Sequence, residues 1–354
     1  MKVYYVSSGL QGCYFVRCLL PLQSNGWNGD RTSLYTSTKL EDKSQATKES
    51  DIVVFHRPEE EGKLKLARLL KKQGKKIVFD NDDTYKDDGG FRLNEFMDRE
   101  RLDRGLKTLN EHVDAFIKEA DLVTCSTKFL AEEYLKLNPN VIHLPNYIDP
   151  FYFDEPLKND TDVVRIGITG SIAVTGDLSV LEPIVKHYHK DKRVKLVLFA
   201  MPPANEDKKL RELYHDEYEF WDNVDIEWQT FVTIEEYFET LNELRLDMMI
   251  IPRGENYFNR CKSNLKFLEA SMFEIPCIAQ SFSTGDSPYE QDTEDKDYML
   301  MATDYDSWIE QMEKLITNKE LRQELGKKAR EYVENKYNIE NNAYKWEDAY
   351  KLIK

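Results

Sequence analysis

Three carboxylates, Asp80, Asp82 and Asp83, directly follow the apolar run 77–79, of sequence IVF. Asp80 and Asp82 have the D-x-D spacing, which allows two carboxylates to share one divalent metal ion. The same side chains can instead cap the backbone N–H groups of a turn or accept hydrogen bonds from hydroxyl groups. The pattern leaves a metal site, a structural cap and a hydroxyl-binding site open.

A second set of charged residues lies in the segment 252–279, of sequence PRGENYFNRCKSNLKFLEASMFEIPCIA. If residues 262–273 form a helix, Lys262, Lys266 and Glu269 fall on one narrow face. A helix N-terminus favours anions, two lysines add positive charge, and a carboxylate further on can accept hydrogen bonds from a ribose diol. This set suits a nucleoside diphosphate. A plain ion-pair face on a surface helix has the same spacing.

His56 and Arg57 directly follow the apolar run 52–55. In open parallel sheets, ligands lie beyond the carboxyl ends of the strands, so both side chains are candidates for the edge of a binding cleft. We expect His56 to hydrogen-bond a substrate and Arg57 to contact a phosphate. The alternative is that His56 binds a loop carbonyl in a structural role, which is the commoner use of such a histidine.

Short apolar runs alternate with longer amphipathic segments in the first part of the chain, which predicts a parallel sheet with crossover helices. The expected strands are 3–6, 52–55, 77–79, 122–125 and 141–144, and the expected helices include 63–73, 95–119 and 127–137. The alternation stops near residue 145, in a stretch with three prolines. A second series of strands and helices begins at residue 163, so the chain is expected to contain two doubly wound units in tandem.

The composition is that of a folded, acidic protein. The 354 residues are 41% hydrophobic and 12% aromatic, and the net charge is −16. This length fits two domains, and the negative field disfavours binding to nucleic acid or anionic lipid over the whole surface. The segment 63–76 has seven cations and no acid, so it is either a solvated helix face or a docking patch for an anionic acceptor. The acidic stretch 285–297 is expected to be an exposed loop.

Five scattered cysteines form no C-x-x-C pair, which favours reduced thiols over a disulfide framework or a zinc site. The first residues read as a strand and a turn with no signal peptide, and no apolar run approaches the ~20 residues of a membrane span. We therefore expect a cytoplasmic protein, with peripheral membrane association through residues 63–76 as an alternative.

Three stretches of the sequence resemble the retaining family 4 glycosyltransferases of GT-B fold, and they follow one another along the chain as in that family. The stretch LKFLEASMFEIPCIA resembles the family's Lys-x-x-Glu helix with the proline and strand that follow it. The stretch at 120–149, from ADLVTCSTKF to LPNYID, is similar to the end of the first domain, and VRIGITGSIAVTGDLSVL resembles the opening of the second. The resemblance covers most of the chain.

The resemblance implies a fold of two Rossmann-like α/β domains that face each other across a cleft. We predict an acceptor-binding domain at 1–150, a domain for the sugar nucleotide at 151–335, and a terminal helix at 336–354 that packs back on the first domain. The implied reaction transfers a sugar from a nucleotide-diphosphate sugar to a hydroxyl group of a glycan, a lipid or another acceptor, with retention of configuration. No cofactor and no metal ion are expected. The oligomeric state stays open.

The resemblance also assigns residues to the site. The residues expected to bind the donor are Gly170, Ser171, Arg253, Lys262, Lys266 and Glu269. The residues expected at the acceptor or along the cleft are Gly9, Gly12, Arg57, Asp80 and Asp83, with His56 and Asp82 as candidates for catalysis. Cys261 departs from the family pattern, which commonly has an acid there, and the loop 170–177 lacks the usual cation.

Two alternatives from other classes remain at this point. One is a glycosyltransferase that modifies a hydroxylated or otherwise modified nucleobase in phage DNA, which shares this fold and would use the basic segment 63–76. The other is a sugar-nucleotide-binding protein without catalytic activity. Since one fold carries many functions, the pattern of elements does not choose among them.

Overall fold

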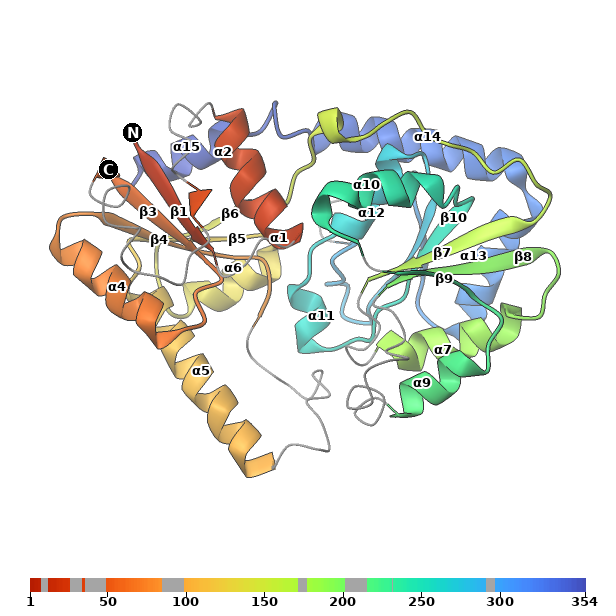
Figure 1. Cartoon of the computed structure of the whole chain (residues 1–354), viewed down its shortest axis with the longest axis horizontal. Helices are drawn as coiled ribbons and strands as arrows, with labels where there is room; N and C mark the ends of the chain where they lie inside the picture. Colours follow the sequence, from red (N-terminus) through yellow and green to blue (C-terminus); the bar gives the residue numbers. More distant parts are fainter. Residues whose placement is uncertain are drawn as a thin grey trace.

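The computed structural model describes residues 1–7, 12–25, 34–35, 49–84, 99–170, 177–200, 215–230, 232–290 and 297–354. Two parallel sheets stand side by side, each covered by helices (Figure 1). This arrangement is the predicted pair of Rossmann-like units.

The first sheet has the strand order β2-β1-β3-β4-β5-β6, and all its strands are parallel. Its strands are β1 (Val3–Ser7), β2 (Leu34–Tyr35), β3 (Ile52–His56), β4 (Lys76–Asn81), β5 (Leu122–Cys125) and β6 (Val141–His143). The helices are α1 (Gly12–Tyr14), the π-helical turn η1 (Phe15–Leu19), α2 (Leu20–Ser24), α4 (Glu61–Lys72), α5 (Arg99–Glu119) and α6 (Lys128–Leu135).

The two faces of this sheet pack against different helices because successive side chains of a strand point to opposite sides. Val53, Phe55 and Phe79 share a core with residues of α4, α5 and α6. Val54 and Val78 face the other way, into a core that contains η1 and continues into the second domain. The carboxyl ends of β1, β3 and β4 are thereby fixed next to each other.

The second sheet has the order β12-β11-β10-β7-β8-β9 and is also parallel. Its strands are β7 (Val164–Thr169), β8 (Val194–Ala200), β9 (Glu227–Thr230), β10 (Met248–Ile251), β11 (Cys277–Gln280) and β12 (Leu300–Ala302). The helices are α7 (Asp177–Tyr188), α9 (His215–Asp222), α10 (Ile234–Glu243), α11 (Tyr257–Cys261), α12 (Leu265–Met272), α13 (Tyr305–Thr317) and α14 (Lys319–Lys336).

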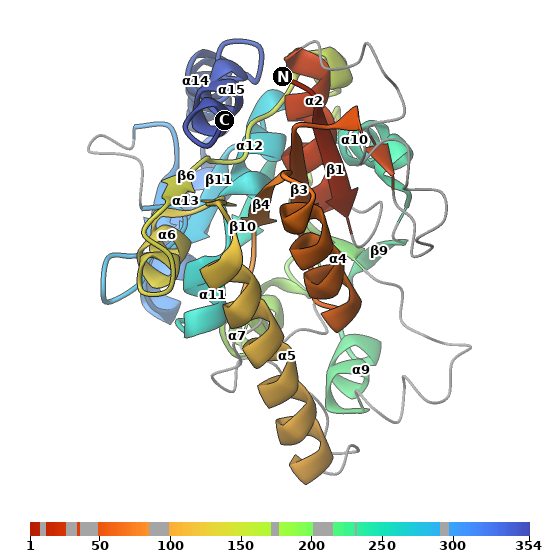
Figure 2. The same cartoon turned by 90° about the vertical axis from the view of Figure 1, so that its left-hand side faces the viewer.

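The chain crosses between the sheets twice. The first crossing follows β6 and includes the 3-10 turn η5 (Pro150–Tyr152). The second follows α14, where Asn338 pairs with Ile148 in a parallel β-bridge. The last helix, α15 (Tyr344–Lys351), lies with the first domain beside α2, as both views show (Figures 1 and 2). There the Tyr350 hydroxyl lies 2.9 Å from the Tyr5 hydroxyl, and both side chains are buried.

The basic segment 63–76 forms most of α4, and several of its cations have acidic partners. Arg68 pairs with Glu119 at 2.5 Å, Lys71 with Asp121 at 3.2 Å, and Lys65 with Glu61 at 2.8 Å. These pairs reduce the positive charge available to an anionic partner. In the described part of the chain, no helix is long and apolar enough to cross a membrane.

Candidate active site

The second-domain half of the site is built around the carboxyl end of β7. Gly170 directly follows this strand and has a φ of +114°, a conformation that side chains disfavour. The Lys266 Nζ donates to the Thr169 carbonyl, and a Cβ at position 170 would collide with this ammonium group. The backbone conformation therefore favours glycine here, and its lack of a side chain leaves room for the end of the lysine.

Lys262, Lys266 and Glu269 do not share one helix, and the prediction of a helix over 262–273 is wrong at its start. The short helix α11 ends at Cys261, and Lys262 is extended, with φ −68° and ψ 154°. The helix α12 begins only at Leu265, after Asn264. The Asn264 side chain does not cap this helix and instead donates to the Tyr337 hydroxyl at 3.3 Å.

Lys266 and Glu269 do lie on α12, where the side chain of Lys266 is half-buried and that of Glu269 is buried. Burial, reinforced by the nearby Arg253, lowers the pKa of Lys266 to about 7. Burial raises the pKa of Glu269 to about 7, against the effects of a hydrogen bond from Tyr237 and of Lys266. The Tyr237 hydroxyl donates to Glu269 Oε2 at 2.9 Å. Because both pKa values lie near 7, a charged ligand that binds beside these groups changes their protonation at neutral pH.

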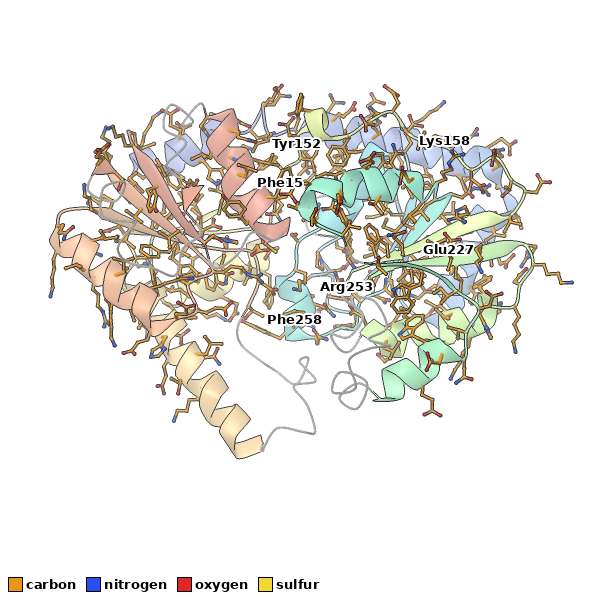
Figure 3. All side chains as sticks on the ribbon, in the orientation of Figure 1. Phe15, Tyr152, Lys158, Glu227, Arg253 and Phe258 are labelled. Carbon is orange, nitrogen blue, oxygen red and sulfur yellow. The ribbon has the colours of Figure 1, made fainter. Side chains whose placement is uncertain are left out.

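Arg253 lies two residues beyond β10 and is oriented by Asp177, the first residue of α7. Its Nη1 donates to Asp177 Oδ2 at 2.8 Å. The other oxygen of Asp177 accepts from the Gly254 N–H at 3.0 Å and from Asn259 Nδ2 at 2.8 Å. Figure 3 labels Arg253 and Phe258, a residue of α11. Asp177 thus fixes a cation at the start of α7.

The first-domain half of the site contains His56, Arg57 and Asp82 at the carboxyl ends of β3 and β4. His56 Nδ1 lies 2.9 Å from the Ser7 hydroxyl, and its Nε2 lies 3.4 Å from Asp82 Oδ1. Arg57 Nε lies 3.3 Å from the same oxygen. Burial alone would raise the pKa of Asp82, but Arg57 and His56 outweigh it and hold this pKa well below its ordinary value. His56 is 2% exposed, so its ring is enclosed by these partners.

Asp83 and Lys262 join the two halves. The Lys262 ammonium pairs with Asp83 Oδ2 and lies 4.0 Å from the centre of the Phe258 ring. Arg57 Nη2 approaches the same Asp83 oxygen at 2.9 Å. A carboxylate of the first domain is thus held between one cation from each domain. The backbone of Lys262 is extended and not helical, and in this conformation its side chain reaches Asp83 of the first domain.

Asp80 is separated from the other two carboxylates and has a structural position. It lies within β4 and is 1% exposed. Arg17, which is fully buried in η1, donates to Asp80 Oδ1 at 3.1 Å and to Oδ2 at 2.6 Å, and the Thr124 hydroxyl donates to Oδ2 at 2.6 Å. Asp80 and Asp82 therefore serve different partners, and the cleft-edge position expected for Asp80 is wrong.

Among the described residues, no group of three or more His, Cys, Asp and Glu side chains is arranged to hold a metal ion. Gly9, Ser171 and residues 291–296 of the acidic loop lie outside the described residues. Gly12 begins α1, and a Cβ there would be in ordinary contact with Ile234 of α10, at 3.9 Å. Gly12 thus lies where the two domains meet.

The sequence analysis missed the residues that orient the site: Arg17, Asp177 and Tyr237. Arg17 stands in the apolar run CYFVRCLL, where a cation requires a buried acid, so its position was a usable signal. Asp177 ends the glycine loop 170–177, which the sequence analysis assigns to the donor site without naming this residue. Tyr237 lies on the amphipathic helix α10, and nothing in the local pattern distinguishes it from a core residue.

One family model is similar to part of the chain. Residues 193–348 match a model described as "Glycosyl transferase-like". This span contains Arg253, Lys262, Lys266 and Glu269. A comparison of the sequence with curated proteins finds no match.

Similar solved structures cover nearly the whole chain. Anabaena Alr3699/HepE, solved in complex with UDP and glucose, superposes with a TM-score of 0.67 at 9% identity over 99% of each chain. A glycosyltransferase from Rickettsia africae gives 0.63 at 12% identity, over 99% of this chain and 98% of its own. A sucrose-phosphate synthase from Thermosynechococcus elongatus gives 0.61 at 14% identity, over 88% and 75%. The predicted GT-B fold is thereby confirmed.

Proposed function

We propose that the protein is a retaining glycosyltransferase, similar to family 4, that transfers a sugar from a UDP-sugar to a hydroxyl group of a glycan or lipid acceptor. The observation that carries this proposal is the convergence of Lys266, Arg253 and Glu269 at the carboxyl end of β7, beside a glycine with positive φ. Two cations and an approachable backbone suit a diphosphate, and the carboxylate suits a ribose diol. The UDP and glucose bound by the Anabaena protein support the choice of a uridine donor.

In the proposed reaction, the bond between the sugar C1 and the diphosphate oxygen breaks while the acceptor oxygen bonds to the same face of C1. The acceptor proton passes to the departing phosphate, so no side chain is needed as a covalent nucleophile. Lys266 and Arg253 stabilise the negative charge that develops on UDP. The protein thus contributes position and electrostatic stabilisation.

The first domain is proposed to hold the acceptor. Asp82 and Asp83, with Arg57 and Lys262, form a compact set of two anions and two cations at the junction of the domains. Arg57, whose side chain is 22% exposed, is the group of this set best suited to hydrogen-bond a hydroxyl of the acceptor, because His56 and Asp83 are almost fully enclosed. The five cysteines all have free thiols, which is in keeping with a cytoplasmic site of action.

A thermal-shift panel tests the donor. The wild-type protein is heated with UDP, UDP-glucose, other UDP-sugars, and the matching GDP and ADP compounds. A ligand at 100 times its Kd stabilises the folded protein by about 2.7 kcal/mol, so the true donor raises the melting temperature measurably. We expect UDP compounds to do so and Glu269→Ala to abolish the effect while keeping the fold. A panel in which no nucleotide raises the melting temperature would refute the proposal.

The affinity for UDP is expected to peak near pH 7. Above this pH, Lys266 loses its proton in the free protein, and the diphosphate loses a cationic partner. Below it, Glu269 becomes protonated and accepts hydrogen bonds from the ribose less well. Isothermal titration calorimetry from pH 5.5 to 9 measures both limbs. An affinity that is constant over this range would contradict the assignment of these two side chains.

We propose that transfer needs no metal ion, because Lys266 and Arg253 supply the positive charge. The two carboxylates of the D-x-D pattern support the proposal because they have different partners. Asp80 pairs with Arg17, whereas Asp82 faces His56 and Arg57. The expected result is full transfer activity after dialysis against EDTA, measured as UDP release. Activity that is lost with EDTA and returns with Mn²⁺ or Mg²⁺ would show that the metal-independent scheme is wrong.

A further inference from the structure

The Glu269 carboxylate has one hydrogen-bond partner within the described parts of the chain, and this partner comes from a different helix. The Tyr237 hydroxyl of α10 donates to Glu269 Oε2 at 2.9 Å. Glu269 is 9% exposed, so water can supply few of the hydrogen bonds that a carboxylate needs. The contact with Tyr237 leaves Oε1 as the oxygen available to a ligand.

Tyr237 is itself held in place by packing. Its ring stacks on Phe199 of β8, with centroids 5.2 Å apart and planes inclined by 21°. The neighbouring Phe238 packs against Phe15 of the first domain at 5.7 Å. The helix that carries both begins with a capping box, in which the Thr233 N–H donates to Glu236. The direction of the Tyr237 hydroxyl is therefore set by rigid neighbours.

We infer that Tyr237 is a positioning residue, which orients Glu269 and favours its anionic form so that Oε1 can accept hydrogen bonds from the donor ribose. A tyrosine hydroxyl donates a hydrogen bond to a carboxylate oxygen, and this hydrogen bond is stronger when the carboxylate is charged. The role of Glu269 toward a ribose is that of the proposed function, so the inference rests on it.

The chemistry of the pair gives the inference a measurable consequence. Burial raises the pKa of Glu269, whereas the hydrogen bond from Tyr237 lowers it. Removal of the hydroxyl takes away the opposing effect, so more of Glu269 is protonated near neutral pH. A hydrogen bond to a charged group contributes about 1.5 kcal/mol or more, which corresponds to a shift of about one pH unit.

The test compares Tyr237→Phe with the wild-type protein and with Tyr188→Phe. The first variant keeps the ring on Phe199 and loses only the hydroxyl. The control removes a hydroxyl that also donates to a glutamate, Glu313 at 3.1 Å, between α7 and α13. Calorimetry with UDP from pH 5.5 to 9 is expected to show the acidic limb of Tyr237→Phe about one pH unit higher, with about tenfold weaker binding at pH 6.5. The control should follow the wild type.

A second measurement needs no ligand. Carbon-13 NMR follows the titration of the glutamate carboxyl groups in the free protein, and Glu269→Gln identifies the resonance of Glu269. The inference expects its midpoint to rise in Tyr237→Phe and to stay unchanged in Tyr188→Phe. An unmoved midpoint overturns the inference even if UDP binds. A midpoint that rises in a protein that does not bind UDP supports the orientation by Tyr237 and refutes the proposed function instead.

Discussion

Replacement of Lys266 by methionine is expected to lower kcat/KM for the UDP-sugar by about 10- to 150-fold. A hydrogen bond to a charged partner contributes about 1.5–3 kcal/mol, and each 1.4 kcal/mol is a factor of ten. The effect should fall on kcat as well as on KM, because the leaving diphosphate becomes more negative as the bond to the sugar breaks. Initial rates of UDP release, measured over a range of donor concentrations, separate the two terms.

Methionine is the appropriate replacement because it retains an unbranched chain of similar length without a charge. The fold is expected to persist, since burial already disfavours the charged form of Lys266. Lys314→Met on α13 is the matched control. Its ammonium group pairs with Glu310 at 2.7 Å on an exposed helix face, so its rates should equal those of the wild type. Equal rates for Lys266→Met would remove this lysine from the donor site.

Replacement of Asp80 by alanine is expected to destabilise the protein by about 3–5 kcal/mol. This change leaves the Arg17 guanidinium, which is fully buried, without its carboxylate partner. An uncompensated buried charge is the costly outcome, because the acceptors that remain for Arg17 among the described residues, the Leu144 carbonyl and Asn146 Oδ1, are neutral. Urea denaturation followed by circular dichroism measures the difference in the free energy of unfolding.

The control for this change is a pair of similar chemistry at the surface. Arg68 and Glu119 also form a bidentate contact, at 2.8 and 2.5 Å, but their side chains are 49% and 41% exposed. Glu119→Ala should therefore cost less than about 1 kcal/mol. If Asp80→Ala retains its stability and instead loses transfer activity, Asp80 belongs to the acceptor site after all.

The predictable part of this protein was the order of its elements. Apolar runs such as 52–55 and 122–125 form buried strands almost as expected, since a strand covered on both faces reads as a continuous hydrophobic run. The grouping of His56, Asp82 and Asp83 also followed from sequence, because parallel strands bring their carboxyl ends to one edge. The position of a residue at the end of a strand does not specify which side chains it contacts at that edge of the sheet.

The errors arise where tertiary contacts override local patterns. Helical periodicity extended back to Lys262, but the actual break at 262–264 lets this residue reach Asp83 across the domain junction. Asp80 was placed with the other carboxylates because its partner, Arg17, lies 63 residues earlier in the chain. The apolar run around Arg17 indicates that this cation needs a buried acid, but which acid it pairs with depends on the packing of η1 against the sheet and cannot be read from a local window.

The position of α15 has a consequence for the biosynthesis of the chain. Trp346 and Tyr350 are both buried and complete the core around Tyr5 and Arg17. The N-terminal domain therefore lacks part of its core until residues 344–351 have left the ribosome, after the entire second domain. Domains usually fold in the order of their synthesis, but here the first domain can acquire its full stability only last. A nascent chain stalled before residue 344 would expose this surface to chaperones.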